Sequence, residues 1–207
     1  MYTDNRKKRL RLLVKTLNRQ RKKQALKIDI LCNDFISAQR NFLGRLRTTL
    51  FTANFYESVL AITDTKKLLF TAAELIRKEL ADTNITFFIR NLETFELYLF
   101  QGNQTTTLSK KQLENYFKPE LLENICDSNR TLLNEEISAS GLCADSIGLD
   151  NLSMAAIPLR AAESSAGFIL LCRPGRFTTA ELSNISAVAV GLSKAILSCQ
   201  RQLQSSL

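Results

Sequence analysis

A long stretch that favours a helix opens the chain. Residues 5–50 contain no proline and a single glycine, at position 44. Apolar side chains recur along it at steps of three and four residues. The one longer step, of eleven residues, fits three helical turns, so the stripe resumes on the same face. We therefore predict one continuous helix of about 45 residues, about 65 Å long at 1.5 Å per residue.

The second half of this predicted helix has an apolar stripe but no core of its own. A narrow stripe with steps of three and four residues is typical of a coiled-coil seam. We expect a second copy of the chain to cover it, in a homodimer whose interface is formed by Ile28, Leu31, Phe35, Ala38, Phe42 and Leu46. Residues 1–52 are thus expected to form a helical arm, and residues 53–207 a separate domain.

Charge is distributed unevenly between these two parts. Residues 1–48 hold 14 Lys and Arg against 3 Asp and Glu, and the rest of the chain has a net charge of −3. Basic clusters can contact phosphates without reading base sequence, and no DNA-binding motif or interleaved aromatic residue accompanies them. They therefore predict a solvated face, or a surface for an acidic partner or for non-specific nucleic-acid binding. This basic patch comprises Arg6, Lys7, Lys8, Arg9, Arg11, Arg21, Lys22 and Lys23.

Several kinds of chemistry are excluded by residues that the chain lacks. It has no histidine, which removes His-based general base catalysis, catalytic triads with His and zinc sites that need His. Its five cysteines are widely spaced and form no CxxC pair, so we expect no zinc knuckle or disulfide framework but a reducing, cytoplasmic setting. Neither a signal peptide nor an uncharged apolar run of membrane-spanning length is apparent.

Beyond the arm, helical and extended patterns alternate. Residues 54–62 have helical spacing, as do residues 65–81 behind Asp64, a candidate N-cap. Two β-hairpins are predicted, from strands at 85–90 and 95–100 and from strands at 154–159 and 166–173. We also expect short helices at 110–117 and 119–126, a short strand at 130–134, a loop or weak helix at 135–152, and a last helix from Thr178 or Thr179 to about residue 200. This order predicts an α+β fold, in which an antiparallel sheet of five or six strands packs its helices on one face.

A series of motifs in residues 54–200 resembles the GAF domain family. It begins with Asp64-Thr-Lys-Lys-Leu-Leu-Phe-Thr-Ala-Ala-Glu-Leu-Ile before the first strand. It continues with Ala156-Ile-Pro-Leu, Ala166-Gly-Phe-Ile-Leu-Leu and Phe177-Thr-Thr-Ala-Glu-Leu before the last helix. The preceding long helix is similar to the signalling helices that join and dimerise such domains.

The resemblance implies a sensor with a small-molecule pocket on the sheet face opposite the main helices, roofed by residues 108–152. Without histidine, haem ligation through His is excluded and bilin attachment is disfavoured, so no cofactor is expected and the ligand is unknown. The alternative for the strand residues is ordinary core packing, and for the cysteines ordinary buried thiols. The pocket candidates are Phe88, Tyr98, Phe100, Cys126, Cys143, Met154, Ala156 and Phe168.

Three functions follow from these patterns. The first is a cytoplasmic, dimeric, non-enzymatic sensory module that binds a small molecule or partner and acts on a downstream signalling protein. The second is an adaptor with a filled pocket, whose basic helix binds an acidic partner or nucleic acid. The third, least supported by the residues, is a small redox enzyme that uses Cys126 and Cys143.

Overall fold

The computed structural model describes residues 2–91, 94–101, 110–142, 152–161 and 164–204, with the backbone alone at 2–6, 8, 112 and 203–204. Internal contacts divide the chain into two compact units, Met1–Arg47 and Thr48–Leu207. Each unit is described separately. We call the second unit the body.

Helix α1 spans Tyr2–Val59 and so crosses the boundary between the units. The separate short helix expected at 54–62 is wrong, because residues 54–59 continue α1 and the helix ends there. No glycine or proline lies between Gly44 and Val59, and the Thr52 and Ser58 hydroxyls donate hydrogen bonds to the carbonyls four residues earlier, at 2.8 Å each. The helix ends where the Ile62 N–H bonds to the Val59 carbonyl, three residues back.

The body is built on a five-stranded antiparallel sheet with the order β2-β1-β5-β4-β3. Its strands are β1 (Asn84–Asn91), β2 (Thr94–Phe100), β3 (Leu132–Leu133), β4 (Ser153–Ala161) and β5 (Ser164–Arg173). Both predicted hairpins are confirmed, as β1–β2 and β4–β5. The strand expected at 130–134 is reduced to the two residues of β3, which pair with Ala155 and Ala156.

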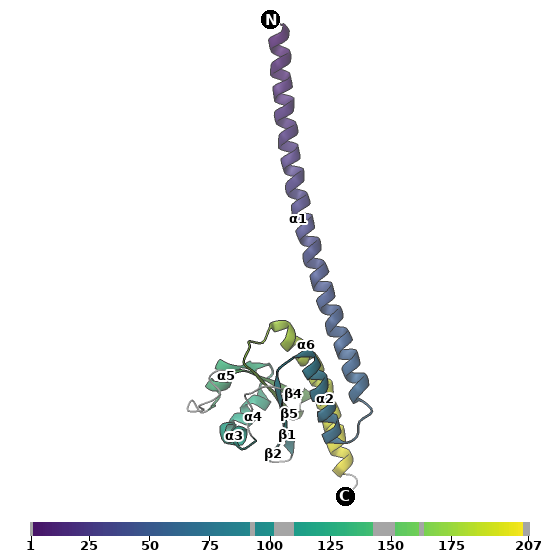
Figure 1. Cartoon of the computed structure of the whole chain (residues 1–207), viewed down its shortest axis with the longest axis vertical. Helices are drawn as coiled ribbons and strands as arrows, with labels where there is room; N and C mark the ends of the chain where they lie inside the picture. The colour runs from purple at the N-terminus through teal and green to yellow at the C-terminus, as the bar shows by residue number, and fades with distance from the viewer. Residues whose placement is uncertain (1, 92–93, 102–109, 143–151, 162–163, 205–207) are drawn as a thin grey trace. The chain divides into compact units, whose positions relative to one another are not determined.

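Two long helices cover one face of the sheet (Figure 1). They are α2 (Thr65–Glu79), which begins after the Asp64 N-cap as predicted, and α6 (Thr179–Gln204). Phe55 and Val59, at the end of α1, pack into the same core with α2, α6 and one side of the sheet. By length and composition alone, Thr179–Gln202 could span a membrane, but Ile185, Val188 and Ile196 are fully buried in this core.

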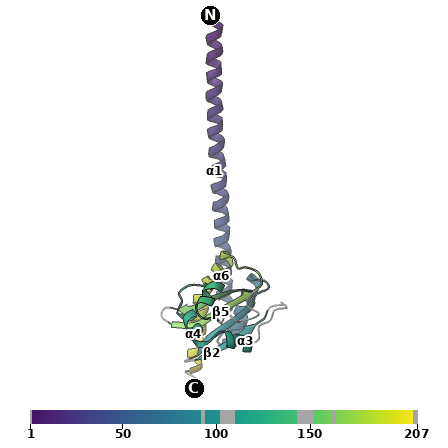
Figure 2. The same cartoon turned by 90° about the vertical axis from the view of Figure 1, so that its left-hand side faces the viewer.

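Three short helices cover the other face of the sheet, which Figure 2 places towards the viewer. They are α3 (Lys110–Tyr116), α4 (Pro119–Asp127) and α5 (Asn134–Ala139). The predicted α+β fold is confirmed, although helices lie on both faces rather than one. The segment expected as a loop or weak helix begins with α5, whose first turn is held by the Glu136 carboxylate, which accepts a hydrogen bond from the Leu133 N–H at 3.1 Å.

A buried polar link joins α6 to its neighbours within the body. The Asn184 side-chain amide is 6% exposed and donates to the Glu79 carboxylate of α2 at 2.8 Å. Its oxygen accepts a hydrogen bond from the Thr48 hydroxyl at 2.6 Å. Because a buried amide without partners costs free energy, these bonds fix how the three elements align.

The start of α6 is fixed by an ion pair between Arg173 and Glu181. The guanidinium donates to both carboxylate oxygens, at 3.0 and 2.8 Å, and its carbon lies 4.4 Å from the Phe177 ring centroid. The Thr178 N–H also donates to Glu181, at 2.7 Å, and the Thr178 hydroxyl accepts from the Glu181 N–H, so the two residues form a capping box at the start of the helix. Chiefly through the bond from Arg173, the pKa of Glu181 is lowered to about 2.

We expect this ion pair to make stability depend on acid pH. The folded-state pKa lies below the usual value of 4.5, so the contribution is complete above about pH 4.5 and is lost as the pH falls towards 2. Glu181→Gln should lower the free energy of unfolding at pH 7 by about 1–3 kcal/mol and flatten this part of the pH profile, as measured by urea denaturation. Glu114→Gln is the control, because its 3.8 Å pair with Lys110 is half-exposed and should contribute little. Equal losses in both variants would contradict the assignment.

Candidate functional site

Strand alternation separates the predicted pocket residues onto two faces of the sheet. Phe88, Met154, Ala156 and Phe168 lie on the face covered by the short helices, and all are buried there. Cys126 of α4 is buried against them. These five residues are therefore brought together, whereas Cys143 lies outside the described residues.

Tyr98 and Phe100 lie on the opposite face, so the prediction that they share one pocket with Phe88 is wrong. In the β1–β2 register, Tyr98 is opposite Phe87 and Phe100 is opposite Ile85, and all four contribute to the core beneath α2 and α6. The strand pattern alone could not assign the faces, because both sides of β1 are buried.

Three phenylalanine rings fill the centre of the short-helix face. Phe88 and Phe168 stack with centroids 4.6 Å apart and planes 11° from parallel. Phe117, the residue directly after α3, covers both, with its ring centroid 5.2 Å from that of Phe88 and 6.3 Å from that of Phe168. All three side chains are at most 2% exposed. Where the described residues meet on this face, the space is therefore occupied by aromatic side chains.

The thiols near this face are poorly suited to reaction. Burial raises the pKa of Cys126 to about 11, although a hydrogen bond with Ser165 opposes the shift. Burial also raises the pKa of Cys172 to about 12. Because the thiolate is the nucleophile, these groups are almost wholly protonated and unreactive at neutral pH. Among the residues described, no three Cys, Asp or Glu side chains gather as a metal site would require.

A groove of about 730 Å³ lies between α2 and β2, where the sequence did not predict one. Its walls include the aromatic rings of Phe70, Tyr98 and Phe100, with Lys66 and Lys67 at its rim. Phe70 is 57% exposed and meets Phe100 edge-on, at 6.1 Å between centroids. Burial and the neighbouring Glu96 raise the pKa of Tyr98 to about 12, so its phenol stays neutral. The sequence signal that could have indicated this groove was Phe70, an exposed phenylalanine in the first turns of the helix predicted at 65–81.

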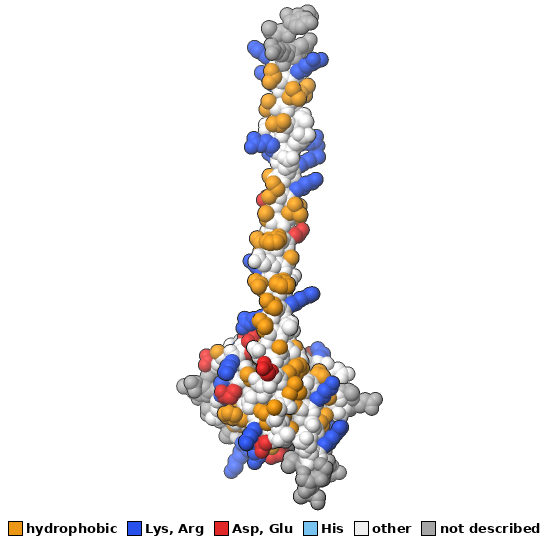
Figure 3. All heavy atoms as spheres, turned by 90° about the vertical axis from the view of Figure 1, so that its right-hand side faces the viewer, with side chains coloured by type: hydrophobic (Ala, Val, Ile, Leu, Met, Phe, Trp, Pro, Cys, Tyr) orange, Lys and Arg blue, Asp and Glu red, His pale blue; other side chains and the backbone are white. Residues whose placement is uncertain are grey.

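The first unit carries both surfaces predicted for the arm. Figure 3 shows hydrophobic side chains along α1 and Lys and Arg side chains concentrated in its N-terminal half. The predicted interface residues all lie exposed on one face of the helix, with Phe35 70% and Leu31 67% exposed. We call this stripe, Ile28, Leu31, Phe35, Ala38, Phe42 and Leu46, the seam.

The basic patch is also exposed where the structure describes it. Lys7, Arg9, Arg11, Arg21, Lys22 and Lys23 are exposed, while the side chains of Arg6 and Lys8 lie outside the described set. These residues do not form a single face, because steps of one or two residues place side chains in different directions around a helix.

No family model matches the chain, and no curated protein matches it in sequence. Solved structures do. A GAF domain/HD domain protein from Geobacter sulfurreducens matches with a TM-score of 0.53 and 18% identity, over 67% of this chain and 95% of that one. The GAF domain of a predicted sensor histidine kinase from Pseudomonas syringae pv. tomato matches with a TM-score of 0.53 and 16% identity, over 82% and 97%. The body has the GAF fold.

A third similar structure agrees with this fold. It is the GAF domain of phosphoenolpyruvate-protein phosphotransferase from Acinetobacter, with a TM-score of 0.52, 12% identity, and coverage of 74% of this chain and 92% of that one. The resemblance in the short motifs is confirmed at the level of architecture. The sheet face that the resemblance implied for a ligand is, in this GAF fold, the face that Phe88, Phe117 and Phe168 occupy.

Proposed function

We propose that the protein is a non-enzymatic regulatory module that dimerises through α1 and acts on a partner macromolecule. The observation that carries the proposal is the seam, whose large side chains are 44–70% exposed in the single chain. An apolar stripe of this length in water favours association, and its spacing is that of a coiled coil.

A hollow in the seam supports pairing with a second helix. Ile28, Leu31, Cys32 and Phe35 surround a hollow of about 320 Å³, together with Ile36. The first four stand at positions i, i+3, i+4 and i+7, which are the four corners that receive one side chain in knobs-into-holes packing. A second copy offers a matching stripe with phenylalanine, leucine and isoleucine as inserted side chains.

The filled sheet face supports partner binding over the enclosure of a small molecule there. A ligand at that position would have to displace Phe117 from its contacts with Phe88 and Phe168. The raised thiol pKa values and the lack of histidine support a non-enzymatic role. The described cysteines are free thiols, which fits the reducing cytoplasm.

The dimer is tested by placing charges in the seam. Leu31→Asp with Phe35→Asp should convert the full-length dimer to a monomer, because each interface would bury unpaired carboxylates. We expect the dissociation constant to rise by roughly 1000-fold or more, as measured by sedimentation or light scattering across a dilution series.

Leu26→Asp with Ile30→Asp is the matched control for the seam. These side chains are 62% and 51% exposed and have the same i, i+4 spacing, but they point away from the seam. The control should dimerise like the unchanged protein. A monomeric unchanged protein, or a dimer that survives the seam substitutions, would contradict the proposal.

A second candidate function, small-molecule sensing, is favoured by the groove between α2 and β2. Its aromatic walls and the lysines at its rim suit a flat apolar ligand with an anionic group. Native mass spectrometry of the full chain purified under mild conditions should then show a bound small molecule. Phe70→Ala with Lys67→Gln should abolish that adduct, and an adduct that persists would place the ligand elsewhere.

A further inference from the structure

The N-terminal half of α1 carries an ordered row of positive charge that is narrower than the whole basic patch. Arg11, Lys15, Arg19 and Lys22 are separated by steps of four, four and three residues. Such steps place side chains above one another on one helix face. The row is about 16 Å long at 1.5 Å per residue. We call these four residues the basic ladder.

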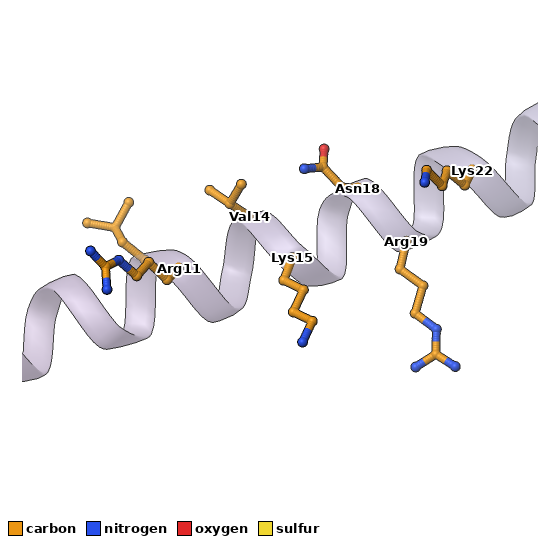
Figure 4. Close-up of a pocket in the computed structure, with 7 residues that line it drawn as sticks. Arg11, Val14, Lys15, Asn18, Arg19 and Lys22 are labelled. Carbon is orange, nitrogen blue, oxygen red and sulfur yellow. The ribbon is translucent and has the colours of Figure 1, made fainter.

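The ladder and the apolar stripe face in opposite directions. At 100° per residue, the ladder centres about 160° from the stripe that Leu10, Leu13 and Leu17 continue from the seam. A dimer that closes through this stripe therefore leaves both ladders open to solvent, on opposite flanks of the helix pair. Figure 4 shows this face, with Val14 and Asn18 along one edge and Lys15 and Arg19 along the other.

The ladder is not neutralised by the chain around it. Residues 5–28 contain no Asp or Glu, and the four side chains are exposed. The ion pairs within the described part of the body do not involve these four residues. These four side chains line a shallow hollow of about 650 Å³ together with Leu10, Val14 and Asn18. An anion of extended, regular charge is needed to meet such a row.

We infer that the basic ladder binds the phosphate backbone of duplex nucleic acid, and that the dimer, with two ladders facing apart, links two duplexes. Duplex DNA presents one negative charge per about 1.7 Å along its axis, so its charge is dense enough for a row of four cations to contact several phosphates. The two arginines add paired donors that match phosphate oxygens. The linking of duplexes rests on the proposed dimer, whereas binding to the ladder does not.

An anionic membrane is the less favoured occupant. A helix that lies in a membrane surface buries its apolar stripe in the lipid, and here that stripe continues the seam on the same face of the helix. Binding to a membrane and dimerisation would therefore compete, and the apolar stripe from Leu10 to Leu17 contains leucines but no aromatic residue. Binding to phosphates through the ladder leaves the seam untouched.

The test measures binding of the full chain to a labelled 24-base-pair duplex by fluorescence anisotropy. Four phosphate contacts predict a slope of about −3.6 for log affinity against log salt, hence a loss of about 100-fold between 50 and 200 mM salt. Arg11→Gln, Lys15→Gln, Arg19→Gln and Lys22→Gln combined should lower affinity at least roughly 30-fold and remove most of this slope. The matched control removes four exposed lysines of the body: Lys78, Lys111, Lys118 and Lys194 to Gln.

The linking of two duplexes by one dimer is measured separately, as fluorescence energy transfer between duplexes that carry donor and acceptor dyes. The unchanged dimer should give transfer, and the seam variant Leu31→Asp with Phe35→Asp should bind duplex without transfer. If the unchanged protein is monomeric and binds duplex without energy transfer, the proposed dimer is contradicted, whereas duplex binding by the basic ladder is supported.

Three results would contradict the proposal that the basic ladder binds duplex nucleic acid. They are no binding of duplex at 50 mM salt, equal losses in the ladder variant and the lysine control, or tighter association with vesicles of phosphatidylglycerol than with duplex. The ladder variant should still dimerise, which shows that any lost binding does not come from a lost fold.

Discussion

Replacing Gly167 with alanine should destabilise the body by about 3–5 kcal/mol, enough to prevent folding of many domains of this size. Gly167 lies in β5 between β1 and β4, with φ at +127°. A Cβ atom there would lie 1.9 Å from the Phe88 carbonyl oxygen and 3.1 Å from the Ile89 Cα. Both neighbours are backbone atoms of β1, which pairs with β2 on one side and β5 on the other, so neither can move without breaking hydrogen bonds between strands. Urea denaturation followed by circular dichroism measures the loss.

Two other glycines separate the causes of this effect. Gly141 has φ at +119° but open space around its Cβ position, so Gly141→Ala isolates backbone strain and should cost about 1–2 kcal/mol. Gly175 has open space and no such φ, so Gly175→Ala should leave stability within about 0.5 kcal/mol. If Gly167→Ala lowers the free energy of unfolding by no more than Gly141→Ala does, the close approach of the Phe88 backbone does not restrict position 167.

Phe117→Ala should lower the free energy of unfolding by about 3–5 kcal/mol and open a cavity over the sheet. The ring is buried and packs on Phe88 and Phe168, which would remain stacked beneath the vacated space. Apolar cavities of this kind bind small aromatic molecules. Benzene or indole should therefore raise the melting temperature of the variant and leave that of the unchanged protein as it is.

Phe70→Ala is the matched control for this substitution. Phe70 is 57% exposed, so its truncation creates no enclosed cavity and should cost less than about 1 kcal/mol. Stabilisation of the unchanged protein by benzene or indole would contradict a face filled by its own side chains. It would then favour a ligand site there after all.

The periodic segments of the body could be predicted because local chemistry and tertiary packing agree there. Asp64 caps α2 through its own side chain, bonding to the Lys67 N–H at 2.8 Å, and both hairpins follow from alternation around polar turns. The end of α1 could not be predicted. Residues 54–62 contain local helix signals of their own, and only the structure shows that 54–59 continue α1 while Phe55 and Val59 pack into the core.

The candidate pocket was predictable only in part, for a different reason. Both faces of β1 are buried, so its apolar run has no polar alternation to show which side meets the long helices. Phe88 and Phe168 were both among the predicted pocket residues, but Phe117 follows α3, more than 25 residues after Phe88, and fills the space through tertiary packing. The seam depended only on spacing within one helix, and all its residues lie on one exposed face.

The shortness of β3 affects how copies of this protein associate at high concentration. β3 pairs only with Ala155 and Ala156, which leaves the rest of the outer edge of β4 without a neighbouring strand in the described part of the chain. Pro158 lies in that stretch and has no N–H to offer an incoming strand. An edge interrupted in this way is a poor template for intermolecular sheets. Concentrated solutions should therefore resist cross-β aggregation at this edge, and association is directed to the helices.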